Sequence, residues 1–148
     1  MTTSRLPDGL AARILDESPD AILICDVDGV VRYWNQGAER VFGFAREEVL
    51  DRSLNSIIAE RFRERHWAAW KIAMSTGVTR YNDGELLGVP ALHRDGRQIS
   101  VEFSIHLVKD PEGRMEWVVA FVRDVTARYI REKALRAALQ SQHGEEIP

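Results

Sequence analysis

The eleven residues at positions 34–44, Trp-Asn-Gln-Gly-Ala-Glu-Arg-Val-Phe-Gly-Phe, limit the fold more than any other stretch of the chain. Trp34 closes an apolar run that is typical of a strand. Asn35 can cap a helix, because its side-chain oxygen can accept a hydrogen bond from a free backbone N–H of the first turn. Gly43 is suited to end that helix. The stretch therefore predicts a strand that passes directly into a short helix, whose buried stripe is Ala38, Val41 and Phe42.

The residues before this stretch predict a leading helix and a hairpin. Three apolar residues have helical spacing: Leu10, Ile14 and Leu15. Pro19 limits this helix, because proline disfavours a helical conformation for the residue before it. An apolar run at positions 21–26 and a second segment at positions 30–34 flank an Asp-Gly pair. Asp-Gly is typical of a tight turn, so we expect two antiparallel strands here.

The rest of the chain predicts helices followed by strands. A short helical turn is expected at positions 46–50 and a longer helix at positions 59–75, with Thr76-Gly77 closing it. Extended segments are then expected at positions 79–93, 98–108 and 115–125. The middle segment alternates apolar residues with polar ones, so one of its faces should be buried. The pattern predicts an α+β fold with a five-stranded antiparallel sheet and helices on one face.

Two further motifs add a family resemblance to this pattern. They are Asp95-Gly96-Arg97, between two predicted strands, and Phe121-Val122-Arg123-Asp124-Val125-Thr126, at the end of the last one. Together with residues 34–44 they resemble the PAS family. PAS domains are small domains that bind a ligand or a partner and transmit the resulting change to the rest of a protein. The resemblance covers residues 14–126 and implies the PAS arrangement of sheet and helices. It also implies that Asp124 and Thr126 relay the signal to the segment that follows.

The resemblance divides the chain into four parts. Residues 1–13 are expected to be an N-terminal extension with a leading helix, residues 14–126 the PAS domain, residues 127–143 a C-terminal amphipathic helix, and residues 144–148 a disordered tail. The C-terminal helix has an apolar stripe made of Ile130, Ala134, Leu135, Ala138 and Leu139. Because a helix of this length is marginal alone in water, the stripe needs a partner.

Two partners for the stripe remain open, the domain's own sheet and the same helix of a second chain. We favour the second, a homodimer formed through the N- and C-terminal helices. A downstream signalling protein or output domain is also expected, and the sequence does not identify it. The chain is interpreted as either a free-standing PAS protein or a fragment of a larger sensor.

His66 is the sharpest candidate for a cofactor ligand. It matches the helix position from which haem-binding PAS proteins of the oxygen-sensor type ligate iron, and a neutral imidazole is a good axial ligand. The resemblance therefore implies haem b held through His66, with Trp70 on the same helix face. Those sensors often present an arginine from the next long strand, and the corresponding position here is Leu87. The opposite wall would then be apolar, made of Leu86, Leu87, Phe103 and Ile105, which favours carbon monoxide, nitric oxide or a redox role over stable oxygen binding.

Other interpretations compete with haem. His66 can instead be structural, and the cavity can hold a small apolar or aromatic metabolite, with Tyr81, Asn82 and Trp117 as polar anchors. The domain can also act only in protein–protein dimerisation. A photosensory flavin is not predicted, because the reactive-cysteine run of those relatives is absent and Cys25 lies on the first strand.

Several functional classes are not favoured. The sequence has no nucleophile elbow, phosphate loop or dinucleotide motif, so we do not expect an enzyme. His93, His106 and His143 are scattered and expected to be solvated. The net charge is −3 and no basic cluster stands out, so a nucleic-acid partner is not expected. No apolar run approaches the roughly 18 residues that a membrane helix needs, and no secretory signal is evident, so the cytoplasm is the expected compartment.

Overall fold

The computed structural model describes the backbone of residues 5–79 and 87–145, and the side chains of residues 5–79 and 88–142. Its centre is a five-stranded antiparallel sheet in the order β2-β1-β5-β4-β3. The strands are β1 (Ala21–Cys25), β2 (Val31–Trp34), β3 (Leu87–Leu92), β4 (Gln98–Lys109) and β5 (Met115–Asp124). The predicted α+β fold is confirmed.

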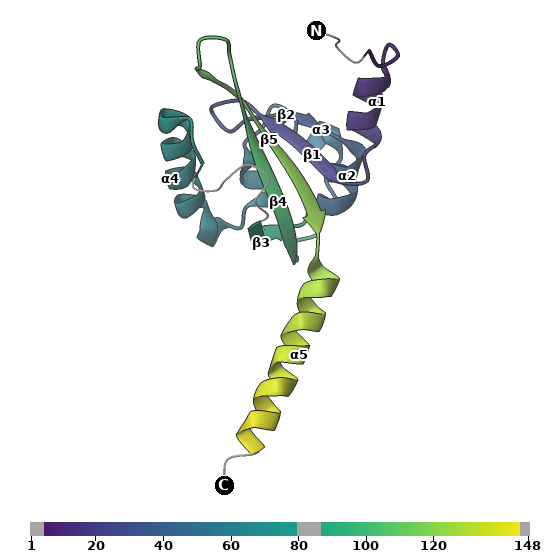
Figure 1. The fold of residues 1–148 in the computed structure, drawn as a ribbon, viewed down its shortest axis with the longest axis vertical. Coiled ribbons are helices and arrows are strands. Elements are labelled where there is room, and N and C mark those ends of the chain that lie inside the picture. The colour runs from purple at the N-terminus through teal and green to yellow at the C-terminus, as the bar shows by residue number, and fades with distance from the viewer. Residues whose placement is uncertain (1–4, 80–86, 146–148) are drawn as a thin grey trace.

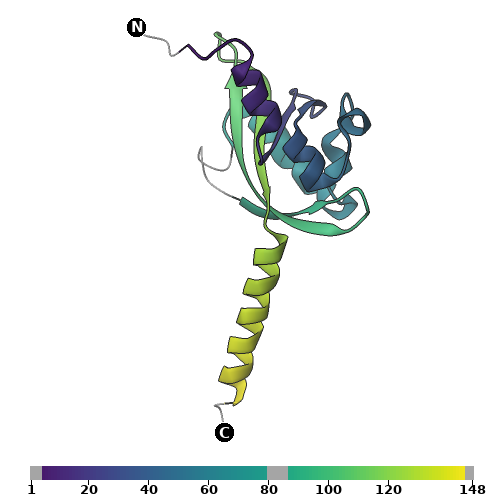
Figure 2. The same cartoon turned by 90° about the vertical axis from the view of Figure 1, so that its right-hand side faces the viewer.

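Five α-helices and one 3₁₀ turn surround or extend this sheet within the described residues. They are α1 (Leu10–Glu17), α2 (Gln36–Phe42), α3 (Arg46–Val49), η1 (Leu54–Ile57), α4 (Glu60–Thr76) and α5 (Thr126–Glu145). Figure 2 shows the sheet edge-on, with the helices between β2 and β3 gathered on one side of it. We call this the inner side. The short η1 was expected to be loop, because four residues are too few to show helical periodicity.

The predicted helix signals at positions 35 and 43 are confirmed. The Asn35 side chain accepts a hydrogen bond from the amide of Ala38 at 2.8 Å. Gly43 ends α2 with a φ of 78°, a left-handed conformation that glycine adopts at little cost. The Asn35 side chain is fully buried. Its oxygen also accepts a hydrogen bond from the amide of Ile22 at 2.8 Å, and its nitrogen donates to the carbonyls of Leu15 and Asp20. It therefore ties α1, β1 and α2 together.

Alternation along β4 places its apolar residues on the inner face. Ile99 and Val101 are 1% and 3% exposed, whereas Phe103, Ile105 and Leu107 are only half-buried. The buried half of the strand packs into a core with Trp34, Phe42 and Val49 from β2, α2 and α3. The inner face is thus tightly covered at one end of β4 and less covered toward the other.

The segment before β3 differs from its prediction. A strand was expected from residue 79, but β3 begins at Leu87 and residues 80–86 lie outside the described part of the chain. The predicted anchors Tyr81 and Asn82 and the predicted wall residue Leu86 therefore also lie outside it.

The C-terminal helix projects away from the domain, as Figure 1 shows. Its apolar residues stay exposed, with Ile130 at 60%, Leu135 at 62% and Leu139 at 48%. The alternative in which this stripe packs back on the sheet is therefore wrong for this structure. The helix runs to Glu145, so residues 144 and 145, expected in a disordered tail, are helical, and residues 146–148 are outside the described part. No helix within the described ranges is long and apolar enough to cross a membrane.

Candidate functional site

Two tryptophans hold α4 against the domain. The indole N–H of Trp67 donates to the side-chain oxygen of Asn55 at 2.7 Å, and that of Trp70 donates to the carbonyl of Val27 at 2.9 Å. The Trp67 ring also covers Gly29, where an added Cβ would lie 2.3 Å from Cη2. The rings of Trp67 and Trp70 pack against the core, while no residue of α4 is itself fully buried. Arg61 also donates to the side chain of Gln98 on β4, so the helix is attached through side chains and not by close backbone packing.

His66 lies beside both indoles. Its ring centroid is 4.6 Å from that of Trp67, edge to face, and 5.8 Å from that of Trp70. Its Nδ1 atom is buried and has no hydrogen-bond partner among the described residues. Burial lowers the pKa of this imidazole below its ordinary value of 6.5, so the ring is neutral near pH 7. The predicted pairing of His66 with Trp70 on one helix face is confirmed.

The predicted apolar wall is only partly described. Phe103 and Ile105 lie on the inner face of β4, and Phe103 packs against the core. Ile105 is paired with Ala120 of β5, which also packs against the core. Leu87 begins β3 opposite Phe103, but its side chain is outside the described set.

Trp117 does not belong to this wall. It is 37% exposed, whereas its neighbour Val118 is 5% exposed and faces the inner side. Successive strand residues point to opposite faces, so Trp117 lies on the outer face of β5 together with Phe121. The prediction that Trp117 contributes to the cofactor site is therefore wrong. The prediction was based on the aromatic character of Trp117. The register of β5, which decides the face on which the side chain lies, cannot be read from that character.

The predicted relay residues meet at the start of α5. The Asp124 carboxylate accepts hydrogen bonds from the backbone N–H of Thr126, at 2.9 Å, and from its hydroxyl. The Thr126 hydroxyl oxygen accepts a hydrogen bond from the backbone amide of Ser100, on β4, at 3.0 Å. The amide of Val125 donates to the carbonyl of Ser100 at 2.8 Å. The first turn of α5 is thus capped by Asp124 and bonded to β4.

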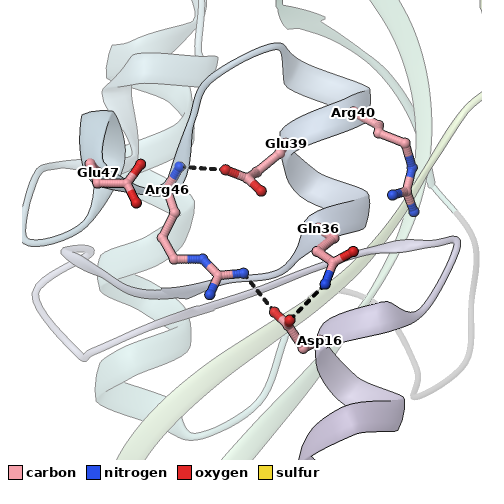
Figure 3. A pocket seen from close by; sticks show the side chains of 6 residues that line it. All are labelled: Asp16, Gln36, Glu39, Arg40, Arg46 and Glu47. Carbon is pink, nitrogen blue, oxygen red and sulfur yellow. Dashed lines mark hydrogen bonds and ion pairs between the residues drawn. The ribbon is translucent and has the colours of Figure 1, made fainter.

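Two surface hollows lie elsewhere. The one in Figure 3 is polar and is lined by Asp16, Gln36, Glu39, Arg40, Arg46 and Glu47. Asp16 of α1 accepts hydrogen bonds there from Gln36 at 2.9 Å and from Arg46 at 2.6 Å, and these contacts lower the pKa of its carboxyl. The hollow therefore marks where α1 is fastened to α2 and α3. The second hollow lies between the end of α4 and the β4–β5 hairpin and includes Met74, Lys109 and Met115. His66 lines neither.

The other singled-out residues do not join the site. His106 is exposed, as expected, but the side chain of His93 is only 14% exposed and lies against Gly43. The expectation that His93 is solvated is therefore wrong, because the β3–β4 turn folds onto the end of α2. His143 has no described side chain. Cys25 is buried, which raises the pKa of its thiol to about 12, so it is a packing residue. Within the described residues, no three His, Cys, Asp or Glu side chains are grouped to hold a metal ion.

Known proteins resemble this chain in sequence and in fold. It is 31% identical over 132 residues to an uncharacterised protein of Azorhizobium caulinodans, covering 88% of this chain and 18% of that protein. It is 27% identical over 134 residues to the sensor protein FixL of Bradyrhizobium diazoefficiens, covering 87% of this chain and 25% of that protein. The chain thus spans a quarter or less of the length of these relatives.

The fold comparison agrees. The crystal structure of a PAS domain from Colwellia psychrerythraea matches with a TM-score of 0.69 at 21% identity, over 80% of this chain and 96% of that one. The family model described as the PAS fold matches residues 15–130, which is most of the sequence and close to the predicted domain. This chain therefore belongs to the PAS fold family.

Proposed function

We propose that this PAS domain binds a small ligand between α4 and the inner face of the sheet and passes its state through β5 to α5. PAS domains are typical of signalling proteins, and a relative is named as a sensor. The proposed activity is binding, and no catalytic step is part of it. Because the chain covers only part of its relatives, the output partner belongs to the proposal and not to the findings.

The observation that carries the proposal is the unpartnered Nδ1 of His66. A buried polar atom without a hydrogen bond costs about 1–3 kcal/mol, and such atoms are uncommon in native proteins. The imidazole is neutral, so it can accept a bond from a ligand or coordinate a metal. His66 lies on α4, which is held by the neighbouring indole side chains of Trp67 and Trp70. These side chains can shift without breaking a packed backbone interface. A ligand that satisfies His66 would remove this cost.

Haem b is the sharpest ligand candidate within this proposal. The buried, neutral imidazole fits an axial ligand, and Trp70 supplies an aromatic surface next to it. Bound haem iron would supply binding of a diatomic gas or a change of redox state. The residues of this chain would hold it through His66 and surround it with apolar side chains from β4, Phe103 and Ile105. With no charged donor on those two residues, we expect carbon monoxide or nitric oxide to be bound in preference to oxygen.

Haemin titration tests this candidate. We expect stoichiometric uptake with a Soret band that shifts on reduction and on carbon monoxide addition, and a changed band or lost uptake in His66→Ala. His106→Ala is the matched control, because His106 is exposed on β4 and should leave the spectrum unchanged. Equal spectra for wild type and His66→Ala would remove His66 as a ligand. A ferrous protein with a long-lived oxygen complex would contradict the expected gas preference.

A haem-free domain is the second candidate, because Trp67 and Trp70 already fill space against the core. In this version the site takes a small apolar or aromatic metabolite, or the domain acts only in dimerisation. Native mass spectrometry of the purified chain separates these outcomes. A bound mass that is lost in His66→Ala supports a metabolite at this site, and a bare dimer with no haemin uptake supports the interaction module.

A further inference from the structure

Charged side chains of alternating sign form a row across the outer face of the sheet. Arg123 of β5 donates to both carboxylate oxygens of Asp20, at 3.0 and 3.2 Å. Arg123 is also the register partner of Glu102 on β4. Glu102 in turn forms an ion pair with Arg128 of α5, and Arg128 lies 3.7 Å from Glu132 one turn further on. The row thus runs from the segment before β1, across β5 and β4, to the second turn of α5.

Sheet geometry explains why these charges meet. The neighbours Val101 and Val122 are buried on the inner side, so Glu102 and Arg123 must point to the outer one. Directly opposed residues of antiparallel strands have Cβ atoms about 4.5–5.5 Å apart, close enough for opposite charges to attract. Within this row the Arg128 side chain is shared by two carboxylates, those of Glu102 and Glu132.

We propose that this charge row sets the direction in which α5 leaves the sheet and connects that direction to the segment after α1. The Asp124 cap and the Ser100–Thr126 bonds fix where α5 begins, but they involve only Thr126, its first residue. Arg128, two residues further along the helix, adds a second attachment point on β4 through its ion pair with Glu102, and two points determine the tilt of a helix. At the other end of the row, the carbonyl of Asp20 is bonded to Asn35, which also binds the carbonyl of Leu15 in α1. A shift of α1 would therefore bias α5 whichever ligand the domain binds.

The helix is long enough to make a change of tilt measurable. A label on Gln140 is 14 residues from Thr126 (140 − 126), or about 21 Å along the axis at about 1.5 Å per residue. A tilt of about 20° would move that label by roughly 7 Å. Glu47 on α3 and Gln140 are both exposed and suit a pair of cysteine spin labels. The native Cys25 is buried and its thiol pKa is raised, so it should stay unlabelled.

The test compares label distances in charge-neutralising variants, with labelled chains diluted by unlabelled ones. We expect Glu102→Gln and Arg128→Gln each to broaden or shift the Glu47–Gln140 distance distribution, and the double variant to match the single ones, because both remove the same pair. Asp20→Asn should give a smaller shift that disappears in the Glu102→Gln background. Raising the salt concentration should move the wild type toward these variants.

Arg114→Gln is the matched control, because Arg114 is an exposed arginine with ion pairs to Asp110 and Glu112 in the β4–β5 hairpin, outside the row. It should leave the distribution unchanged. Circular dichroism verifies that each variant is folded. Wild-type distances in folded Glu102→Gln and Arg128→Gln would overturn the proposal, and so would additive effects in the double variant. Neither result bears on haem uptake, so this proposal and the proposed function can fail separately.

Discussion

Two buried polar side chains, Asn35 and His66, differ in how far their hydrogen bonds are satisfied. Asn35 satisfies all its hydrogen-bonding capacity in the interior, whereas Nδ1 of His66 satisfies none among the described residues. The first arrangement is typical of a structural anchor. The second leaves a buried acceptor whose partner must be a group outside the described residues, such as an ordered water, an ion or a ligand.

Replacing Asn35 should cost more stability than any exposed substitution. Asn35→Ala leaves the amides of Ile22 and Ala38 and the carbonyls of Leu15 and Asp20 without their partner. Each unsatisfied buried group costs about 1–3 kcal/mol, so we expect the free energy of unfolding to fall by about 3–5 kcal/mol, measured by urea denaturation. Asn35→Asp keeps the acceptor but places a carboxylate oxygen against the carbonyls of Leu15 and Asp20, so at neutral pH it should lose at least as much stability as alanine. A loss below about 1 kcal/mol for Asn35→Ala would show that the hub is not structural.

His66 should make the fold less stable in mild acid. Because burial lowers its folded-state pKa below the ordinary 6.5, the unfolded chain binds the proton more tightly. The free energy of unfolding should therefore decline as the pH falls below 6.5 toward the folded-state pKa. His66→Gln lacks this contribution, so the pH slope between about 7.5 and 5.5 should be shallower than in wild type. Identical slopes in chemical denaturation would contradict the assigned neutral, buried imidazole.

At the scale of elements, α4 lies beside the sheet without a fully buried residue of its own, and the apolar stripe of α5 is exposed. The indoles of Trp67 and Trp70 reach from α4 to η1 and to the β1–β2 turn. Attachment by a few side chains lets a helix move with little loss of packing, which suits a ligand site.

The contact between Gly29 and Trp67 can be tested by a matched pair of glycine substitutions. Gly29 and Gly113 have φ angles of 81° and 84°, so alanine is strained at both. Only at Gly29 would the new Cβ meet a neighbour, the Trp67 ring at 2.3 Å. We expect both variants to lose about 1–2 kcal/mol from the backbone conformation, and Gly29→Ala to lose about 1–3 kcal/mol more. Equal losses in thermal or urea denaturation, with unchanged tryptophan fluorescence, would mean that Trp67 does not rest on this turn.

The whole molecule is a folded domain with a bare amphipathic helix projecting from it (Figure 1). Leu6 and Ile14 at the N-terminal end are also exposed, at 54% and 56%. The exposed stripe of α5, together with Ile14 on α1 and Leu6 just before that helix, is consistent with the homodimer that we proposed from the sequence, in which these helices meet their copies.

Disrupting the α5 stripe should therefore separate the dimer without unfolding the domain. Leu135→Glu places a charge in the stripe, where Leu135 is 62% exposed and makes no core contact in one chain. We expect a mass near the 16.9 kDa monomer by size-exclusion chromatography with light scattering, with the circular dichroism of the domain retained. Gln140→Glu, on the same helix but outside the stripe, is the control and should remain dimeric. A wild-type chain that is already monomeric at micromolar concentration would contradict the dimer.

The sequence by itself determined which elements form and in what order, because caps, turns and periodicity are local properties. Asn35, Gly43, Gly77 and the alternation along β4 each predicted an element that the structure contains. The same local signals placed His66 and Trp70 on one helix face. They also placed Asp124 and Thr126 at the last strand's junction with the C-terminal helix.

Only the tertiary structure decided which distant residues meet. The register of β5 sent Trp117 to the outer face, and the fold of the β3–β4 turn buried most of His93 against Gly43. The anchoring of α1 by Asp16 and the charge row from Asp20 to Arg128 join residues that lie 20 or more positions apart in sequence. Such contacts depend on strand pairing and on the spacing of packed layers. No local pattern encodes that spacing, since it follows from the packing of the whole chain.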